Sequence, residues 1–186
     1  MIILTQIRHL KTYTAPKQHS LAELNALDRE RFVLVVGPVF ERSPWIAEQA
    51  WRERPFRSAR ALHRALCGVV LASDKPDKLA LIRAHPDLAG RAARAGTLSA
   101  ASTREQANGG LDRLSPEEAA LFAKYNRAYR RKFGFPFVIC ARRNKKAAIL
   151  AGFERRLRNS REQELETALA EVFKIAELRL HDLTIA

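Results

Sequence analysis

The chain has 186 residues, 47% of them hydrophobic, with 8 glycines and 8 prolines, a composition that indicates one globular domain and excludes a disordered chain. Its longest apolar runs are far shorter than the roughly 20 residues that cross a bilayer, so no transmembrane helix and no membrane partner are expected. The formal net charge of +13 favours anionic partners, although no recognised nucleic-acid-binding motif accompanies it.

The ends of the chain and its two cysteines bear on location and domain limits. Cys67 and Cys140 lie far apart in apolar surroundings, which indicates two buried free thiols in a reducing, cytoplasmic compartment. The first 20 residues are basic and contain no acid, but no apolar core with a cleavage site follows. We therefore expect an irregular N-terminal extension over 1–20 and a folded domain over 21–186.

Signals for helix starts recur through the first half of the chain. The predicted N-cap residues are Ser20, Asp28, Ser43, Ser58 and Asp74, each followed by an apolar run with helical spacing,. The run that follows Asp28 is expected to end at Val36, and the helix after Ser43 is expected to continue to about Trp51. The segment opened at Ser73-Asp74 leads into His85.

Similar signals continue in the second half. Asp87 can cap a short helix that Gly96 ends, and Ser115 opens a helix that continues to about Lys132,. Helices over 144–158 and 160–183 complete the set. The β-like stretch 135–141 contains Pro136, which is disfavoured in a central strand, so it is predicted to be an extended, buried connector. The expected fold is all-α: one helical bundle of about eight helices with this single connector.

The segment 81–90, LIRAHPDLAG, contains the first candidate for chemistry. A residue before proline is pushed out of the α region, so His85 is predicted to lie at a rigid helix end before Pro86,. Its ordinary pKa of about 6.5 lets an imidazole take and give a proton near neutral pH. By itself the motif is also compatible with a structural histidine at a helix terminus.

A second candidate segment is 102–106, STREQ. Ser102 with Glu105 has the spacing of a capping box, which would be purely structural,. However, Gly109 and Gly110 follow almost at once, and glycine costs a helix about 1 kcal/mol relative to alanine. A short helix before a glycine hinge is also suited to presenting side chains to a ligand, and the spacing leaves both interpretations open.

Two further stretches have both a structural and a functional interpretation. The connector 135–141 is either core filler or a source of backbone N–H and C=O groups for an amide-like or urea-like ligand. Arg156, near the predicted end of a helix at Asn159, either stabilises the helix dipole or binds a carboxylate,. No metal-ligand, dinucleotide, P-loop or GxSxG pattern is present.

Seven stretches, taken together and in this order, are a more specific family signature than any one of them alone. They are ALDRERF, VFERSPW, AHPDLAG, STREQ, YRRKFGFPFVIC, RLRNS and KIAELRL. Together they closely resemble the family of 2-oxo-4-hydroxy-4-carboxy-5-ureidoimidazoline (OHCU) decarboxylases, over roughly residues 22 to 183. Enzymes of that family take the last step from urate to (S)-allantoin in purine catabolism. The sequence departs from the family pattern at Arg42, where histidine is usual before Ser-Pro-Trp.

The resemblance implies an all-α enzyme, often a homodimer, that needs neither metal nor organic cofactor and acts on a small anionic ureido acid. It implies His85 as the acid–base catalyst and Glu105 as the essential carboxylate. The substrate-contacting residues that it implies are Pro86, Ser102, Thr103, Arg104, Gln106, Phe137, Val138, Ile139, Cys140, Ala141 and Arg156.

Two other functions compete with this one. A basic helical module could bind nucleic acid through its charge alone, and it would then show steeply salt-dependent binding. An inactive family member could serve as an interaction partner, but the intact motif residues argue against it.

Overall fold

The computed structural model of the protein describes residues 18–185. This part of the chain contains ten α-helices, three short 3-10 helices and one isolated parallel bridge between His19 and Thr184. The predicted all-α class is confirmed. Most of the expected N-terminal extension, residues 1–17, lies outside the described residues. No helix within 18–185 combines the length and apolarity needed to cross a membrane.

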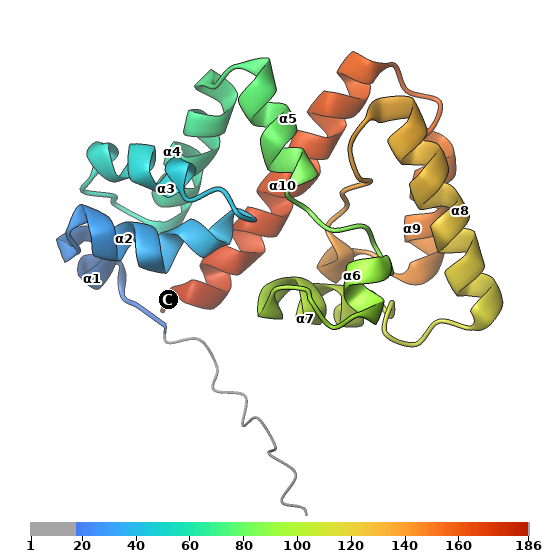
Figure 1. Ribbon diagram of the computed structural model, residues 1–186. Coiled ribbons are helices and arrows are strands. Elements are labelled where there is room, and N and C mark those ends of the chain that lie inside the picture. The colour runs from blue at the N-terminus through green and yellow to red at the C-terminus, as the bar shows by residue number, and fades with distance from the viewer. Residues whose placement is uncertain (1–17, 186) are drawn as a thin grey trace, which may run out of the picture.

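A long C-terminal helix forms the centre of the molecule. This helix, α10 (Arg161–Leu183), runs between two groups of shorter helices (Figure 1). One group contains α1 (Leu21–Ala26), α2 (Arg29–Val36), η1 (Gly37–Val39), α3 (Trp45–Ala50), η2 (Trp51–Glu53), α4 (Ala59–Ala72) and α5 (Lys75–Arg83). The other contains α6 (Arg91–Arg94), α7 (Ala100–Asn108), α8 (Pro116–Phe133), η3 (Ala141–Arg143) and α9 (Lys146–Arg156).

Most of the predicted helix starts are confirmed. Side chains of six residues accept a backbone N–H in the first turn of their helix: Ser20, Asp28, Ser58, Asp74, Ser115 and Ser160. Two predicted caps are wrong. The Ser43 hydroxyl donates to the carbonyl of Glu41, and Asp87 pairs with Arg130 while α6 begins after Gly90 without a side-chain cap. The side chain of Ser43 is used in a local turn, and that of Asp87 in a tertiary ion pair. Neither is available to cap a helix.

The segment between α8 and η3 is extended and buried, as predicted. The ring of Phe137 stacks on Phe153 of α9 with centroids 3.8 Å apart, and it meets Tyr129 of α8 edge-on at 5.2 Å. Such aromatic pairs contribute about 0.5–1.5 kcal/mol each beyond the area they bury. The connector is thus fixed against α8 and α9 through its side chains.

Candidate active site

One pocket collects most of the residues that the sequence singled out. It holds about 450 Å³ of empty space, its open mouth included, and lies where α5, α7, the connector and α10 meet. The predicted residues that line it are His85, Pro86, Ser102, Glu105, Gln106, Phe137, Val138, Ile139, Cys140 and Ala141. They are joined by Leu88, Arg142, Ile175 and Arg179.

His85 lies directly after the end of α5, at the predicted corner. Its side chain is buried, and its Nδ1 atom lies 3.0 Å from the carbonyl oxygen of Leu81. A carbonyl only accepts hydrogen bonds, so Nδ1 carries the proton and the lone pair of the neutral ring is on Nε2. Burial lowers the pKa of His85 to about 4, although the hydrogen bond to Leu81 works in the opposite direction. The ring is therefore neutral at physiological pH and can act as a base.

The segment after His85 is held by side chains from two other helices. Ala89 has a φ of 50°, in the left-handed region that costs a residue with a Cβ about 1–2 kcal/mol,. Its N–H donates to the side chain of Gln106 at 2.9 Å. Arg130 Nε reaches the two carboxylate oxygens of Asp87 at 2.8 and 3.0 Å. These contacts with α7 and α8 hold the corner in its strained conformation.

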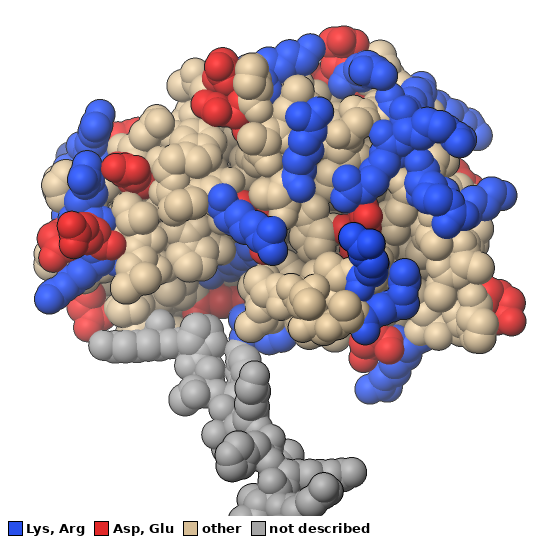
Figure 2. All heavy atoms as spheres, viewed as in Figure 1, with Lys and Arg blue, Asp and Glu red and all other residues tan. Residues whose placement is uncertain are grey.

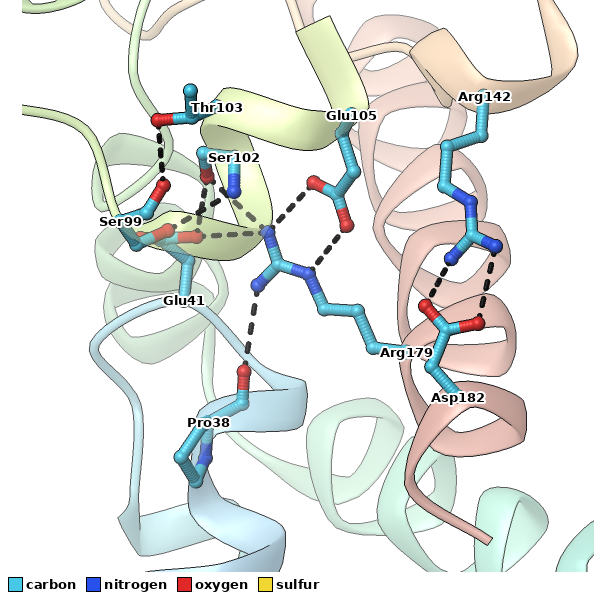
Figure 3. A network of polar contacts seen from close by, with 9 residues as sticks. All are labelled: Pro38, Glu41, Ser99, Ser102, Thr103, Glu105, Arg142, Arg179 and Asp182. Atoms are coloured by element: carbon cyan, nitrogen blue, oxygen red, sulfur yellow. Dashed lines mark hydrogen bonds and ion pairs between the residues drawn. The ribbon is translucent and has the colours of Figure 1, made fainter. Parts of the chain in front are cut away.

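Helix α7 begins three residues earlier than the capping-box interpretation requires. Ser99 is its N-cap and accepts the N–H of Ser102, so Ser102 and Glu105 both lie inside the helix. Of the two interpretations that the spacing left open, the capping box is therefore excluded. Because the two residues are three positions apart, they share one face of α7, and in Figure 3 both point toward Arg179 of α10.

Arg179 lies at the centre of a buried polar network (Figure 3). Its Nε and Nη2 atoms lie 2.7 and 2.8 Å from the two carboxylate oxygens of Glu105. Nη2 also lies 3.0 Å from Glu41, which accepts the Ser102 hydroxyl at 3.0 Å as well. Nη1 donates to the carbonyl of Pro38 at 3.4 Å. A single guanidinium thus joins the loop before α3 to α7.

The charges in this network support one another. Burial disfavours the charged form of Glu41, but the adjacent Arg179 outweighs it and holds the pKa of Glu41 below its ordinary value. Burial likewise opposes the charged form of Arg179, and Glu105 and Glu41 together raise its pKa. Glu41 and Arg179 are therefore ionised at neutral pH, in positions where an unpaired charge would be very costly,.

The connector lines one wall of the pocket, and two of its backbone groups are paired with side chains of other helices. Cys140 donates its N–H to Glu171 at 2.8 Å, and the carbonyl of Val138 accepts from Arg156 at 2.7 Å. The N–H groups of Val138 and Ile139 have no hydrogen-bond partner within residues 18–185. Because buried backbone donors are rarely left unpaired, these two N–H groups are suited to a ligand with carbonyl or ring acceptors.

Three predicted substrate-contacting residues do not line this pocket. Thr103 is exposed and donates to the carbonyl of Ser99, and Arg104 lines a neighbouring groove. Arg156 is buried behind the connector, where its Nε and Nη2 bind Glu164 at 2.8 and 2.5 Å. Its guanidinium also lies 4.4 Å from the ring centroid of Phe137. In this position Arg156 supports the pocket wall from outside.

Glu41 and Arg179 were not among the residues predicted for the site, although both lie in stretches that carry the family resemblance. A signal for Arg179 was present, since it follows Val172, Ile175 and Ala176 at spacings of seven, four and three residues. This places an arginine on the apolar stripe of a helix, which is unusual unless the charge is paired. Nothing local marks Glu41, because its partner is 138 residues away.

The described residues contain no group of three His, Cys, Asp or Glu side chains that could hold a metal ion.

Comparison with known proteins identifies the family. The family model for OHCU decarboxylase matches residues 25–181. A 2-oxo-4-hydroxy-4-carboxy-5-ureidoimidazoline decarboxylase from Halalkalicoccus jeotgali is 42% identical over 166 residues, 89% of this chain and 92% of that protein.

Two solved structures share the fold. A crystal structure of (S)-allantoin synthase superposes with a TM-score of 0.72 and 28% identity, over 89% of this chain but about half, 54%, of that longer chain. A crystal structure of an OHCU decarboxylase in the presence of (S)-allantoin superposes with a TM-score of 0.62 and 26% sequence identity. The match covers 75% of this chain and 89% of the other. With its pocket, its fold and its sequence in agreement, this chain belongs to the OHCU decarboxylase family.

Proposed function

We propose that the protein is a carboxy-lyase that converts OHCU to (S)-allantoin in the degradation of urate, without a cofactor. The observation that carries this proposal is the shared pocket of a neutral, buried His85, the Glu105–Arg179 pair and two unpaired connector N–H groups. Membership of the decarboxylase family and the likeness to a structure determined with (S)-allantoin support it.

The substrate itself supplies the electron sink. Its C4 carries a carboxylate and a hydroxyl next to the C=N bond of C5. When the bond from C4 to the carboxylate breaks, its electron pair forms a C4=C5 bond and the imine nitrogen takes up a proton. The hydroxyl then loses its proton to form the carbonyl, and C5 gains a proton on one face. In total, one proton replaces carbon dioxide. No external sink is required.

In this scheme His85 handles the protons. The neutral ring presents a lone pair on Nε2, which can accept the proton of the substrate hydroxyl, and the imidazolium that results can give a proton back. General acid–base catalysis of this kind is typically worth about 10² to 10⁴ in rate. The hydrogen bond from Nδ1 to Leu81 keeps the ring in the tautomer that this role needs,.

The other residues of the pocket bind and orient the substrate. Glu105 accepts the ureido or ring N–H groups, and the free N–H groups of Val138 and Ile139 donate to carbonyl oxygens. Arg179 takes the part that the resemblance suggested for Arg156, because its guanidinium lines the pocket and can stabilise anionic oxygens,. The positive charge of the chain favours approach of an anionic substrate.

The chirality of the product tests the proposal. Freshly prepared OHCU decays without enzyme to racemic allantoin, whereas the protein should yield one enantiomer, followed by circular dichroism. Glu105→Gln is the matched inactive control, because it keeps the shape of the side chain and removes its charge. Racemic product formed at the uncatalysed rate with the wild-type protein would exclude the proposed function.

The homodimer and the cytoplasmic location that the sequence suggests remain part of this proposal. Light scattering coupled to size-exclusion chromatography would test the dimer, with a mass near twice the 21.0 kDa of the chain as the expected result. Fractionation of the source cells would test the location.

A further inference from the structure

Arg179 has two carboxylate partners, and only one of them belongs to the pocket. Glu105 and Arg179 line the pocket, whereas Glu41 lines a separate groove on the other side of the guanidinium. Glu41 and Glu105 bind the same Nη2 atom of Arg179, at 3.0 and 2.8 Å. Figure 3 shows the guanidinium between the two carboxylates. Glu41 is therefore placed to act on the site without touching a ligand in it.

We propose that Glu41 is a positioning residue for the decarboxylation, which anchors and neutralises Arg179 so that Glu105 keeps its negative charge available to the substrate. This inference rests on the proposed function. It concerns a carboxylate from the loop between η1 and α3.

The cluster around Arg179 contains more carboxylates than cations. Two carboxylates surround one guanidinium, so the cluster carries one surplus negative charge. Arg179 and Glu41 are each only 8% exposed, which makes an unpaired charge at either position costly,. With Glu41 in place, Arg179 has a second counter-ion and the surplus charge lies on Glu105 at the pocket. Without that charge, Arg179 and Glu105 form a neutral pair, and Glu105 becomes a weaker acceptor for the N–H groups of a substrate.

Glu41 also orients the guanidinium of Arg179. Glu41 also accepts the hydroxyl of Ser102, which lies one helical turn before Glu105 on α7. Arg179 Nη2 in turn lies 3.3 Å from the same hydroxyl. Glu41 thus fixes Arg179 and the face of α7 that presents Glu105 by direct hydrogen bonds. Loss of this anchor allows both side chains of the pocket to move.

The inference predicts weaker binding when the charge of Glu41 is removed. Glu41→Gln should raise the KM for OHCU and the Kd for (S)-allantoin, measured by calorimetry, by about tenfold to hundredfold, the factor that a hydrogen bond between charged groups represents. The value of kcat should change much less. Glu41→Asp, which keeps the charge, should restore most of the affinity. The matched control is Glu48→Gln on α3, an exposed glutamate paired with Arg29, which should behave like the wild type.

A double-mutant cycle separates positioning from a general effect on folding. If Glu41 acts through Arg179, then Glu41→Gln should change allantoin affinity far less in an Arg179→Gln background than in the wild type. Wild-type KM and allantoin affinity in Glu41→Gln would overturn the inference, as would equal effects in both backgrounds.

Failure of a Glu41 variant to fold and failure of the proposed function can be told apart. If Glu41→Gln does not fold, Glu41→Ala provides the same test, because it also removes the charge and leaves no amide to bury, and a wild-type KM and allantoin affinity in that variant would again overturn the inference. If the wild-type protein itself makes racemic product and does not bind allantoin, it is the proposed function that fails.

Discussion

At the scale of single residues, the site depends on which charges are buried and how they are paired. Burial keeps His85 neutral, whereas Glu41 and Glu105 both form ion pairs with the buried Arg179. A neutral base beside a fixed carboxylate is what proton transfer at neutral pH requires. Burial thus sets the protonation state of His85, and the buried charges are paired with one another.

Replacement of His85 by glutamine should remove the acid–base group while leaving a folded protein. We expect turnover of OHCU to fall at least about a hundredfold, with a melting temperature within a few degrees of the wild type, because glutamine can still donate to the Leu81 carbonyl. Stopped-flow kinetics and thermal melts would measure both. Turnover near the wild-type rate would remove His85 from the mechanism.

The two buried arginines should differ in their effect on catalysis. Arg179→Gln should lower kcat/KM by about 10² or more, as expected when a group that stabilises the reacting charge is lost. Arg156→Gln leaves Glu164 buried without its cation and should cost about 3–5 kcal/mol of stability, while the protein that remains folded keeps kcat within tenfold. Kinetics normalised to folded protein, with urea unfolding, would distinguish them. If Arg156→Gln lost activity without losing stability, Arg156 would be a substrate ligand after all.

At the scale of elements, the site combines a helix corner, the short helix α7 and an extended connector with side chains of the long helix α10. The corner after α5 is fixed by α7 and α8, and the connector is fixed by aromatic packing against α8 and α9. The corner and the connector therefore form a part of the pocket wall that has few backbone hydrogen bonds of its own and is supported by rigid neighbours. This leaves backbone donors free where a ligand can use them.

Gly90 is the residue at which the corner leaves no room for a side chain. A Cβ there would lie 2.7 Å from Cβ of Asp87 and 3.1 Å from its carbonyl oxygen. Gly90→Ala should therefore cost about 1–3 kcal/mol and lower activity by displacing the segment next to His85. The control is Gly68→Ala in α4, where no atom lies within 4 Å and helix propensity predicts a gain of up to about 1 kcal/mol. Equal stability and activity in the two variants would show that the corner tolerates the change.

At the scale of the whole molecule, positive charge is widely distributed on the surface. Figure 2 shows lysine and arginine side chains over much of one face, densest on the half that contains α8. Exposed examples on that helix are Arg127, Arg130, Arg131 and Lys132. A positive field of this kind attracts small anions.

The nucleic-acid alternative can be tested directly. Because aromatic side chains are not interleaved with the surface charges, we expect no retarded complex with DNA or RNA in a gel-shift assay at physiological salt. A tight, steeply salt-dependent complex would instead make the charge the basis of a second activity.

Global stability should depend on pH through His85. Its pKa is about 4 in the folded protein against an ordinary value of 6.5, so between these values the unfolded chain binds more protons than the folded one. Stability should therefore rise with pH across this window, by up to roughly 3 kcal/mol. Urea unfolding at several pH values from 4.5 to 7 would measure the slope. His85→Gln should flatten it, and an unchanged slope would mean that His85 is not the buried titrating group.

Short-range patterns in the sequence determined the helices, the connector and the His85 corner, because caps, periodicity and proline act over a few residues. They also brought out His85 and Glu105 as candidates, through motifs that are contiguous in the chain. The tertiary structure alone decided which arginine joins the pocket, and it brought Glu41 to the site. The physical reason is that a buried guanidinium needs counter-ions, and those of Arg179 lie 74 and 138 residues away in the chain, a pairing that only the folded arrangement of α10, α7 and the loop before α3 creates.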